Sequence, residues 1–266
     1  MKLNRYLRAR SLLVHASMWH HRTMHFELFD RHATLRVVIE SVLEGRLGRA
    51  VFDDASDPKV ARLDLGCYAV FGGDSNHPAA ARLVESVSAP RELLPPDDQG
   101  WRDLLQKMHG RKLSDRTMRT FSAHTLDRDR LRTMSSRIAA GYRLGRIDEG
   151  RAGRLDESLE PHAMQVFESS AQFARHGIGF CAERDGAMAS AATSYAISSR
   201  RVEIAVATAA DHRGKGLARS VAAALALHCL QNDRIPEWSA GNPVSKRLAL
   251  DLGYLPARLC DIFYLE

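Results

Sequence analysis

One glycine-rich turn constrains the fold of this chain more than any other feature. It reads Arg213-Gly214-Lys215-Gly216-Leu217-Ala218, follows an apolar run at 202–208, and leads into an Ala/Leu-rich helix predicted over Leu217–Gln231. A strand that ends in such a turn at a helix N-terminus presents free backbone N–H groups and a positive helix end, the combination that binds a pyrophosphate. The turn therefore predicts an α/β unit with an anion site, although its spacing matches neither a P-loop nor a dinucleotide fingerprint.

The segments that follow this helix favour one family. An apolar segment at 235–240 is followed by Gly241-Asn242, a second helix predicted over Pro243–Leu252, and Gly253-Tyr254. This order resembles the GNAT superfamily of acyl-CoA-dependent N-acetyltransferases, whose motifs are Arg/Gln-x-x-Gly-x-Gly/Ala after the fourth strand and Asn…Gly-Phe/Tyr near the end. Arg213, Gly216 and Ala218 fill the first motif, and Asn242, Gly253 and Tyr254 fill the second. The alternative is another phosphate-binding α/β unit.

The resemblance implies the fold class and a division of the chain. We expect an α/β protein with a mixed sheet, in which residues 141–266 form a GNAT-like acyl-CoA N-acyltransferase fold. A chain of 266 residues is long enough for a second unit, so residues 26–140 are expected to form an N-terminal accessory α/β domain. Its element order is compatible with a degenerate GNAT-like copy, as in some bacterial members of the superfamily, but it carries no phosphate turn.

Periodicity and turn signals predict the elements of both units. In the first unit we expect helices over Asp30–Glu44, Ala79–Val87 and Trp101–His109, and strands over Arg49–Asp53 and Ala61–Phe71. A helical segment over Asp127–Ala140 leads into the second unit, which starts with a strand over Tyr142–Ile147 and a helix over Pro161–Arg175. Strands over Gly179–Ala182 and Ala187–Ala196 follow, joined by an Asp185-Gly186 turn, the strongest hairpin signal in the chain.

The formal net charge of +6 is concentrated at the start of the chain. The cationic residues that precede the first acidic one, Glu27, are Lys2, Arg5, Arg8, Arg10 and Arg22. We therefore expect a basic N-terminal tail over 1–25. A transit peptide or a nucleic-acid arm has this composition, but a disordered tail, or a start codon assigned upstream of Met18 or Met24, explains it as well. We favour the latter explanations and expect no nucleic-acid partner.

Composition favours an enzyme of the cytoplasm. Hydrophobic residues make up 45% of the chain, and the longest apolar stretch, around Val221–Leu230, is too short to span a membrane. The cysteines at 67, 181, 229 and 260 form no Cys-x-x-Cys pair, which argues against a zinc cluster or a disulfide framework. We expect no metal and no membrane partner, and the oligomeric state stays open.

Acetyl transfer to an amine requires a proton acceptor, because an alkyl amine with a pKa of about 10 is mostly protonated at neutral pH. Two glutamates are candidates for this base. Glu203 lies in the strand before the turn, on the same face as Ala205 and Ala207, and Glu237 lies five residues before Asn242. The alternative for each glutamate is a solvated strand residue.

The resemblance also assigns residues to acetyl-CoA. It implies that backbone groups of Ala207, Thr208 and Ala209 hold the pantetheine and polarise the thioester carbonyl. The other cofactor-binding positions that it implies are Arg213, Gly214, Lys215, Gly216, Leu217, Ala218 and Asn242.

One family residue is missing. The tyrosine that protonates the leaving thiolate lies seven residues after the asparagine in the family, and Ala249 occupies that position here. This departure puts the protonation step in doubt. Ser245 and Tyr254 are candidate substitutes, and a thiol pKa of about 8.5 also lets the thiolate leave unassisted.

Together these residues predict an N-acetyltransferase that moves an acetyl group from acetyl-CoA to a primary amine by direct attack in a ternary complex. The acceptor is expected to be an amine-bearing small molecule or peptide. Two alternatives stay open. A catalytically inactive acyl-CoA-binding regulatory protein is favoured by the missing tyrosine, and a nucleic-acid-associated acetyltransferase is favoured only by the basic start.

Overall fold

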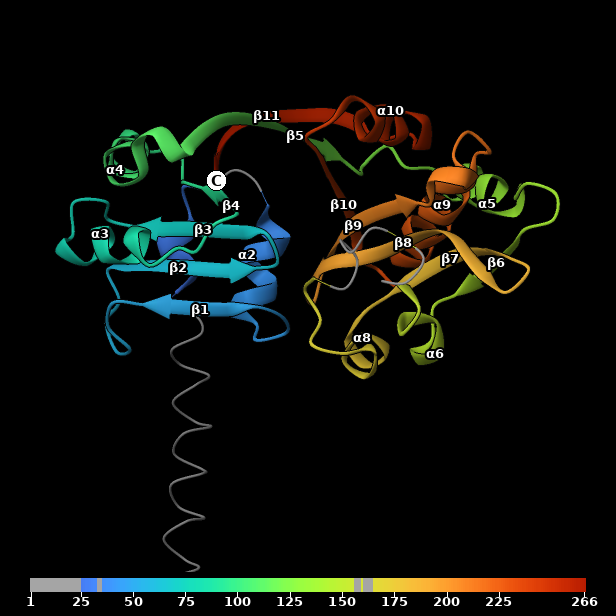
Figure 1. Ribbon diagram of the computed structural model, residues 1–266, viewed down its shortest axis with the longest axis horizontal. Coiled ribbons are helices and arrows are strands. Elements are labelled where there is room, and N and C mark those ends of the chain that lie inside the picture. The colour runs from blue at the N-terminus through green and yellow to red at the C-terminus, as the bar shows by residue number, and fades with distance from the viewer. Residues whose placement is uncertain (1–24, 33–34, 156–158, 160–164) are drawn as a thin grey trace, which may run out of the picture.

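The fold is described from a computed structural model, which defines residues 25–32, 35–155, 159 and 165–266 (Figure 1). Nearly all of the basic tail predicted over 1–25 lies outside these residues, as does part of the helix predicted over 161–175.

The strands form one 11-stranded sheet in the order β1-β2-β3-β4-β11-β5-β10-β9-β8-β7-β6. Their bounds are β1 (Arg49–Phe52), β2 (Val60–Leu65), β3 (Tyr68–Gly73), β4 (Arg91–Leu94), β5 (Leu113–Ser122), β6 (Arg143–Arg146), β7 (Gly179–Arg184), β8 (Ala187–Ile197), β9 (Arg201–Thr208), β10 (Ile235–Ala240) and β11 (Leu255–Leu265). The α-helices are α2 (Arg36–Leu43), α3 (Pro78–Glu85), α4 (Gln99–His109), α5 (Arg128–Ser136), α6 (Glu149–Ala152), α8 (Ser170–His176), α9 (Leu217–Gln231) and α10 (Pro243–Leu252). Short 3₁₀ turns lie at Phe26–Phe29, Gly110–Lys112 and Ala210–His212.

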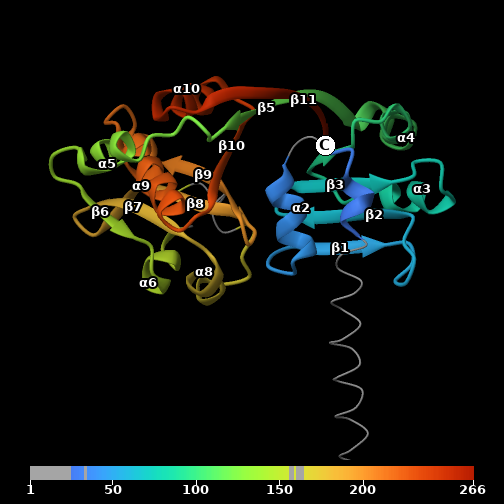
Figure 2. The ribbon, with the colours of Figure 1, turned by 180° about the vertical axis from the view of Figure 1, so that it is seen from behind.

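The sheet has two halves with the same order of elements. The first half runs β1-β2-β3-α3-β4-α4-β5, and the second runs β7-β8-β9-α9-β10-α10-β11. In each half an antiparallel meander leads into a parallel pair joined by a helix, β3 with β4 and β9 with β10. Figures 1 and 2 show the two halves side by side.

The last strand of each half is exchanged with the other half. β11 pairs with β4 of the first half, and β5 pairs with β10 of the second. β5 and β11 also pair with each other, antiparallel, and form the bridge along the top of Figure 1. The sheet is therefore continuous from one half to the other, and the strand at its seam beside β10 comes from the first half of the chain.

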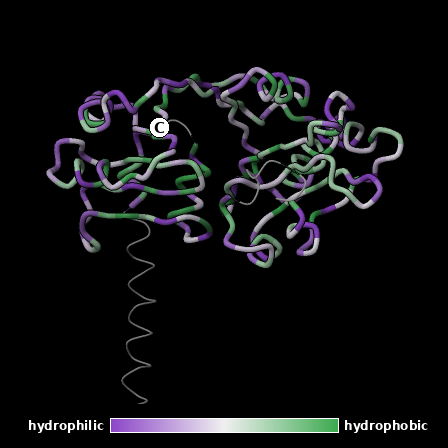
Figure 3. The backbone as a smooth tube through the Cα atoms, viewed as in Figure 1, coloured by the Kyte–Doolittle hydropathy of each residue, from purple (hydrophilic) through white to green (hydrophobic). Residues whose placement is uncertain are grey.

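Hydrophobic burial explains how the helices pack on the sheet. The Ala/Leu-rich helix α9 packs on β8 and β9, and its residues are buried almost all round, as expected for a helix without a polar face. Figure 3 shows hydrophobic stretches along the strands of both halves, whereas α4 is mostly hydrophilic. On α4 only Trp101 and Leu105 are buried, so this helix covers the first half with a narrow apolar stripe.

Several predicted elements are confirmed. The helices predicted over Leu217–Gln231 and Pro243–Leu252 have the predicted bounds, and β1 matches its predicted range to within one residue. Asp185 and Gly186 join β7 to β8 with φ values of 52° and 81°, as in a two-residue hairpin turn.

Other predicted elements are wrong in extent. The single strand predicted over Ala61–Phe71 is a hairpin of β2 and β3, because the chain turns at Gly66 with φ of 52°. The helix predicted from Asp30 starts at Arg36, after Leu35 in a left-handed conformation. The helix predicted over 161–175 starts at Ser170, where the Ser169 side chain accepts a hydrogen bond from the Gln172 amide.

Candidate active site

The ladder between the parallel strands β9 and β10 stops after a short stretch. Its last Cα partners are Glu203 and Glu237. Beyond this pair β10 continues along β5 through residues 238–240, while β9 continues along β8 through residues 204–208. We call the separation between these two diverging segments the strand opening (Figure 1). It leads from Glu203 toward the N-terminus of α9.

The register with β8 determines which backbone groups of β9 face the strand opening. The Ala209 N–H donates to Ala189 O at 2.9 Å and so points toward β8. N–H directions alternate along an antiparallel ladder, so the N–H of Ala207 also points toward β8, and those of Val206 and Thr208 point into the strand opening. The prediction that Ala207 and Ala209 donate their N–H groups to a ligand is therefore wrong. Thr208 keeps this role as a prediction, and Val206 joins it.

The glycine-rich turn leaves the N-terminus of α9 uncovered. Gly214 and Gly216 have φ values of 77° and 76°, and among the described residues no side chain caps the helix. A Cβ at Gly214 would meet nothing within 4 Å, and one at Gly216 would meet only the Arg219 guanidinium at 3.6 Å. The positive φ explains why glycine is needed. The open space above the helix end fits an anionic group, which makes the turn suitable for a pyrophosphate.

Side-chain hydrogen bonds hold the glycine-rich turn in place. Arg213 Nε donates to Thr208 O at 3.2 Å and so links the turn to the end of β9. Lys215 Nζ donates to Asp211 O at 3.0 Å and to Tyr142 Oη at 3.3 Å, and Tyr142 Oη also meets His212 Nδ1 at 2.7 Å. Sequence reasoning missed Tyr142 and His212, because Tyr142 lies 70 residues before His212 and no local pattern connects them.

Glu203 lies where the strand opening begins. Its side chain is 5% exposed, and its Oε1 accepts hydrogen bonds from the N–H and the hydroxyl of Ser239, at 2.9 and 2.6 Å. Burial raises the pKa of Glu203 to about 7, the nearby charge of Glu237 acts in the same direction, and the bonds from Ser239 oppose the shift. This carboxyl group can therefore take up and release a proton near neutral pH, as a general base must.

Glu237 is in a different electrostatic environment. Arg201 Nη1 lies 2.6 Å from Glu237 Oε1, and Arg201 Nε lies 3.4 Å from Glu40 Oε1 on α2. Burial raises the pKa of Glu237, and the Arg201 guanidinium opposes that shift. An ion-paired carboxylate is a weaker proton acceptor than a free one, so Glu203 is the better candidate for the base.

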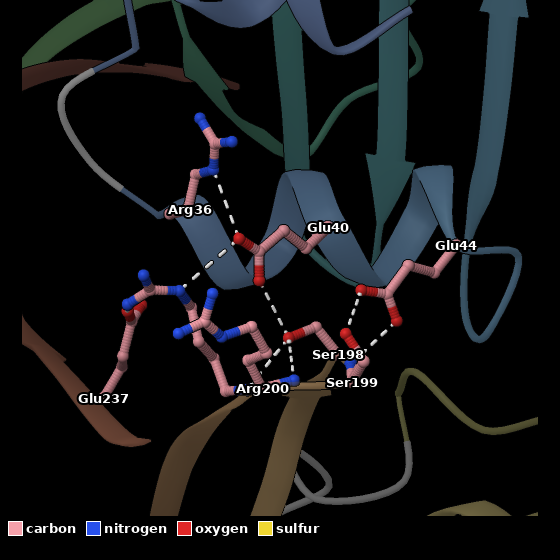
Figure 4. Close-up of polar contacts among 8 residues, drawn as sticks. Arg36, Glu40, Glu44, Ser198, Ser199, Arg200 and Glu237 are labelled. Atoms are coloured by element: carbon pink, nitrogen blue, oxygen red, sulfur yellow. Dashed lines mark hydrogen bonds and ion pairs between the residues drawn. The ribbon is translucent and has the colours of Figure 1, made fainter. Parts of the chain in front are cut away.

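The first half supplies the other carboxylate of this ion-pair network (Figure 4). Glu40 also accepts a hydrogen bond from the Ser198 hydroxyl at 2.8 Å. Glu44, the C-cap residue of α2, accepts from the N–H and hydroxyl of Ser199 at 2.7 and 2.8 Å. α2 thus holds the turn between β8 and β9, and with it the start of the strand that carries Glu203.

Asn242 and Ser245 lie at the start of α10, Ala249 lies within this helix, and Tyr254 follows its end. Asn242 Oδ1 accepts from the Ser245 N–H at 2.8 Å and caps the helix, and Ser245 Oγ accepts from Trp238 Nε1 at 3.1 Å. The Ser245 hydroxyl proton remains available to another acceptor. Ala249 is fully buried. The Tyr254 side chain is 1% exposed, burial raises the pKa of its hydroxyl well above the usual value, and that hydroxyl has no hydrogen-bond partner among the described residues.

A cavity of about 680 Å³ adjoins Glu203. Glu203, Glu237 and Ser239 line it together with residues of α2, of the end of β5 and of the loop that follows β5. Buried titratable groups that line a cavity make that cavity a candidate active site. The cavity therefore gives a second molecule a route to Glu203.

Two negative findings concern the described residues only. In that part of the chain, no group of three or more His, Cys, Asp or Glu side chains is placed to hold a metal ion. None of the helices defined there has the length and apolar character needed to cross a membrane.

Comparisons with known proteins place this geometry in a family. The family model described as GNAT acetyltransferase matches residues 27–260. The chain is 26% identical over 236 residues to the uncharacterized N-acetyltransferase YdfB of Bacillus subtilis strain 168, which covers 85% of this chain and 89% of the relative.

Solved structures agree. A GCN5-related N-acetyltransferase-like protein from Streptococcus suis 89/1591 aligns with a TM-score of 0.81 and 26% identity, over 94% of this chain and 100% of that chain. A tandem GNAT protein from the clavulanic acid biosynthesis pathway shares the fold, with a TM-score of 0.52 and 15% identity over 81% and 83% of the two chains. Because the family match covers most of its length, this chain belongs to the GNAT acetyltransferase family and is an acyl-CoA-dependent acetyltransferase.

Proposed function

We propose that the protein transfers an acetyl group from acetyl-CoA to a primary amine, by direct attack of the amine on the thioester in a ternary complex. The observation that carries this proposal is the position of Glu203. Its buried carboxyl group lies where the strand opening meets the cavity. A donor entering along the strand opening and an acceptor entering through the cavity would meet at this carboxyl group.

The donor would bind along the strand opening. In the proposed pose, the pyrophosphate occupies the uncovered N-terminus of α9 at Gly214 and Gly216. The pantetheine follows β9, and the N–H groups of Val206 and Thr208 donate to the pantetheine and the thioester carbonyl oxygen. Leu217 and Ala218 then act only as the first helical residues behind the turn.

The reaction balances without a metal or a redox partner. Glu203 takes a proton from the acceptor ammonium, and the neutral nitrogen attacks the thioester carbon. The carbon–sulfur bond breaks and coenzyme A leaves as a thiolate, while the nitrogen, which is still positively charged after the attack, gives its second proton to water, so that a neutral amide forms. Ser245 is a candidate donor of a proton to that thiolate, and water is the other.

The supporting experiment measures free thiol release from acetyl-CoA with a panel of primary amines, next to thermal unfolding with acetyl-CoA. At a hundredfold excess over its dissociation constant, a ligand that binds only the native state adds about 2.7 kcal/mol of stability. A thermal shift with amine-dependent thiol release is the expected result. No shift with millimolar acetyl-CoA would overturn the donor assignment.

The missing family tyrosine at Ala249 supports a second candidate, an acyl-CoA-binding regulatory protein without turnover. The same experiment separates the two candidates. A thermal shift without thiol release from any amine would favour the regulatory protein. A small molecule or a peptide as the acceptor, and the cytoplasm as the location, remain part of the proposal.

A further inference from the structure

We infer that the acceptor is an amine with one cationic nitrogen and an apolar body, such as an alkylamine or an arylalkylamine, and that polyamines are poor acceptors. The inference rests on the proposed function, because it takes Glu203 as the base and the 680 Å³ cavity as the acceptor pocket. It is argued from the charges and the walls of that cavity.

The carboxylates of the cavity offer one place for a cationic nitrogen. Glu203 and Glu237 are the carboxylates that line it. Glu237 is paired with Arg201 at 2.6 Å, so its charge is largely neutralised. Glu203 accepts hydrogen bonds from the neutral Ser239, and no ion pair between described residues engages it. One ammonium group fits beside Glu203, which would also deprotonate it.

A second ammonium group would meet positive charge. Arg36 and Arg128 line the cavity in addition to Arg201. Arg36 is partly exposed, at 44% of its side chain, and its Nε lies 3.2 Å from Glu40 Oε1, a carboxylate outside the lining. Arg128 donates to the backbone carbonyl of Leu230 at 2.6 Å. The lining thus holds more guanidinium groups than carboxylates. Like charges in a partly desolvated cavity repel each other more strongly than in water, so a diamine pays a penalty that a monoamine avoids.

The walls suit an apolar body. Apart from the charged groups, the lining is largely hydrophobic and includes Leu35, Phe121, Leu126, Leu230, Ile235 and Pro236. Ile235 is 37% exposed and Leu35 is contributed by the first half, at the start of α2. Each methylene group that such walls remove from water contributes roughly 0.8 kcal/mol to binding. Acceptors with longer alkyl chains should therefore bind more tightly until the cavity is filled.

The test compares two acceptors that differ only in a second amine, n-hexylamine and 1,6-diaminohexane. Thiol release from acetyl-CoA gives kcat/KM for each, and we expect at least a tenfold preference for n-hexylamine, although the diamine offers twice as many reactive nitrogens. In the series from n-propylamine to n-hexylamine, kcat/KM should rise with each methylene. A preference for the diamine would overturn the inference and leave the proposed function intact.

A designed carboxylate sharpens the test. Ile235→Asp places an acidic group at the partly exposed wall, and we expect it to reduce the preference for the monoamine by about tenfold, because the distal ammonium gains a partner. Ile235→Asn is the uncharged control, and Val244→Asp on the exposed face of α10, where Val244 is 80% exposed, is the control for net charge. Equal preferences in Ile235→Asp and wild type would contradict the inference. If neither amine releases thiol while acetyl-CoA still stabilises the protein, the proposed function itself fails.

Discussion

In both halves of the molecule a short ladder joins two parallel strands, but the residues at the end of the ladder differ. The last Cα partners are Val70 and Leu94 in the first half and Glu203 and Glu237 in the second. Equivalent positions thus carry an apolar pair in one half and a carboxylate pair in the other. The first half has no group there that can move a proton.

The third residue of the following helix differs as well. On α4 it is Trp101, whose N–H is held by the capping Asp98, and on α10 it is Ser245, whose N–H is held by the capping Asn242. Trp101 is fully buried and its indole N–H donates to Gly73 O at the end of β3, at 2.9 Å. The indole therefore packs against the end of β3 in the first half, whereas the second half has only the small Ser245 side chain at the equivalent helix position.

The two crossover helices also present different N-termini. On α3 the His77 side chain accepts a hydrogen bond from the Ala79 amide, so the helix end is already satisfied by its own chain. On α9 the N-cap is Gly216, and no side chain in the part of the chain that the structure describes caps the helix with a hydrogen bond. This comparison supports the proposal that the first half is accessory and that donor binding belongs to the second half alone.

The largest effect is expected from covering the end of α9, as His77 covers the end of α3. In Gly216→Glu a carboxylate would occupy and repel the anion site, so we expect the stabilisation by acetyl-CoA to disappear. Differential scanning fluorimetry with and without acetyl-CoA measures this. Gly186→Glu is the matched control, because Gly186 also has a positive φ of 81° and open space around its Cβ. If Gly216→Glu keeps the shift, donor binding does not use this helix end.

The next effect concerns the indole that fills the first half. Trp101→Ala should lower the free energy of unfolding by about 3–5 kcal/mol, the usual cost of truncating a buried aromatic side chain. Chemical denaturation measures this loss. Titration calorimetry should still find one acetyl-CoA per chain, because the N-terminus of α3 stays capped by His77. In addition, Val70 occupies the position in the first half that Glu203 occupies in the second. A second bound acetyl-CoA would show that the first half contains a donor site that the Trp101 indole blocks. It would contradict the conclusion that only the second half binds the donor.

Glu203→Gln should lower the rate of thiol release by roughly 10²-fold near neutral pH while leaving acetyl-CoA binding intact. The wild-type kcat/KM should rise with pH through about 7 as Glu203 loses its proton, and the variant should lack that rise. Glu237→Gln is the matched comparison, and its effect should be smaller because Arg201 already neutralises Glu237. If Glu203→Gln keeps the wild-type pH profile, Glu203 is not the general base, and water or the acceptor itself takes up the proton.

The same carboxyl group should make stability depend on pH. The pKa of Glu203 is raised in the folded protein, from 4.5 to about 7, so the folded state favours the protonated form. Its contribution to stability is present below pH 4.5 and is lost as the pH rises from about 4.5 to 7. Glu203→Gln should therefore gain up to about 3 kcal/mol relative to wild type between pH 4.5 and pH 8. Denaturant unfolding at the two pH values tests this, and an unchanged difference would contradict the burial of a titrating carboxyl group.

The smallest effect is expected at Arg213. Its Nε bonds to Thr208 O, but the backbone N–H groups of the turn stay in place when the side chain is removed. Arg213→Ala should weaken acetyl-CoA binding about fivefold, or about 1 kcal/mol. Arg247→Ala, on the exposed surface of α10 with a side chain that is 79% exposed, should change nothing. A loss of binding in Arg213→Ala as complete as that in Gly216→Glu would show that the guanidinium, not the backbone, holds the donor.

Features set by local sequence could be predicted from the sequence. The turn at Arg213–Ala218, helix α9 and the hairpin turn at Asp185-Gly186 depend on neighbouring residues, and all of them are in place. Glu203 could be proposed as a base from its place in the strand. Its burial, and the contrast with the ion-paired Glu237, could not be predicted, because they depend on Ser239 and Arg201 across two strands.

Features set by distant pairing could not be predicted. Neither β4, β5 nor β11 was expected, because β11 pairs with β4 and β5, which precede it by well over a hundred residues. The direction of the N–H groups along β9 escaped prediction for the same reason, since it follows from the register with β8. The sequence predicted a helix over Trp101–His109, but the packing of the Trp101 indole against the end of β3 could be seen only in the fold.

The strand exchange bears on the order in which the molecule can be completed during synthesis. β4 is made early, yet its partner β11 is made after every other described strand. Until then β4 presents an unpaired edge, the kind of surface on which chains associate incorrectly. The first half therefore cannot complete its sheet until β11, the last strand of the second half, has been made. If the nascent chain were released before residue 255, β11 would be missing and neither half would have its full set of strands. A protein built in this way cannot shed its first half without also losing β5, the strand that flanks β10 beside Glu203.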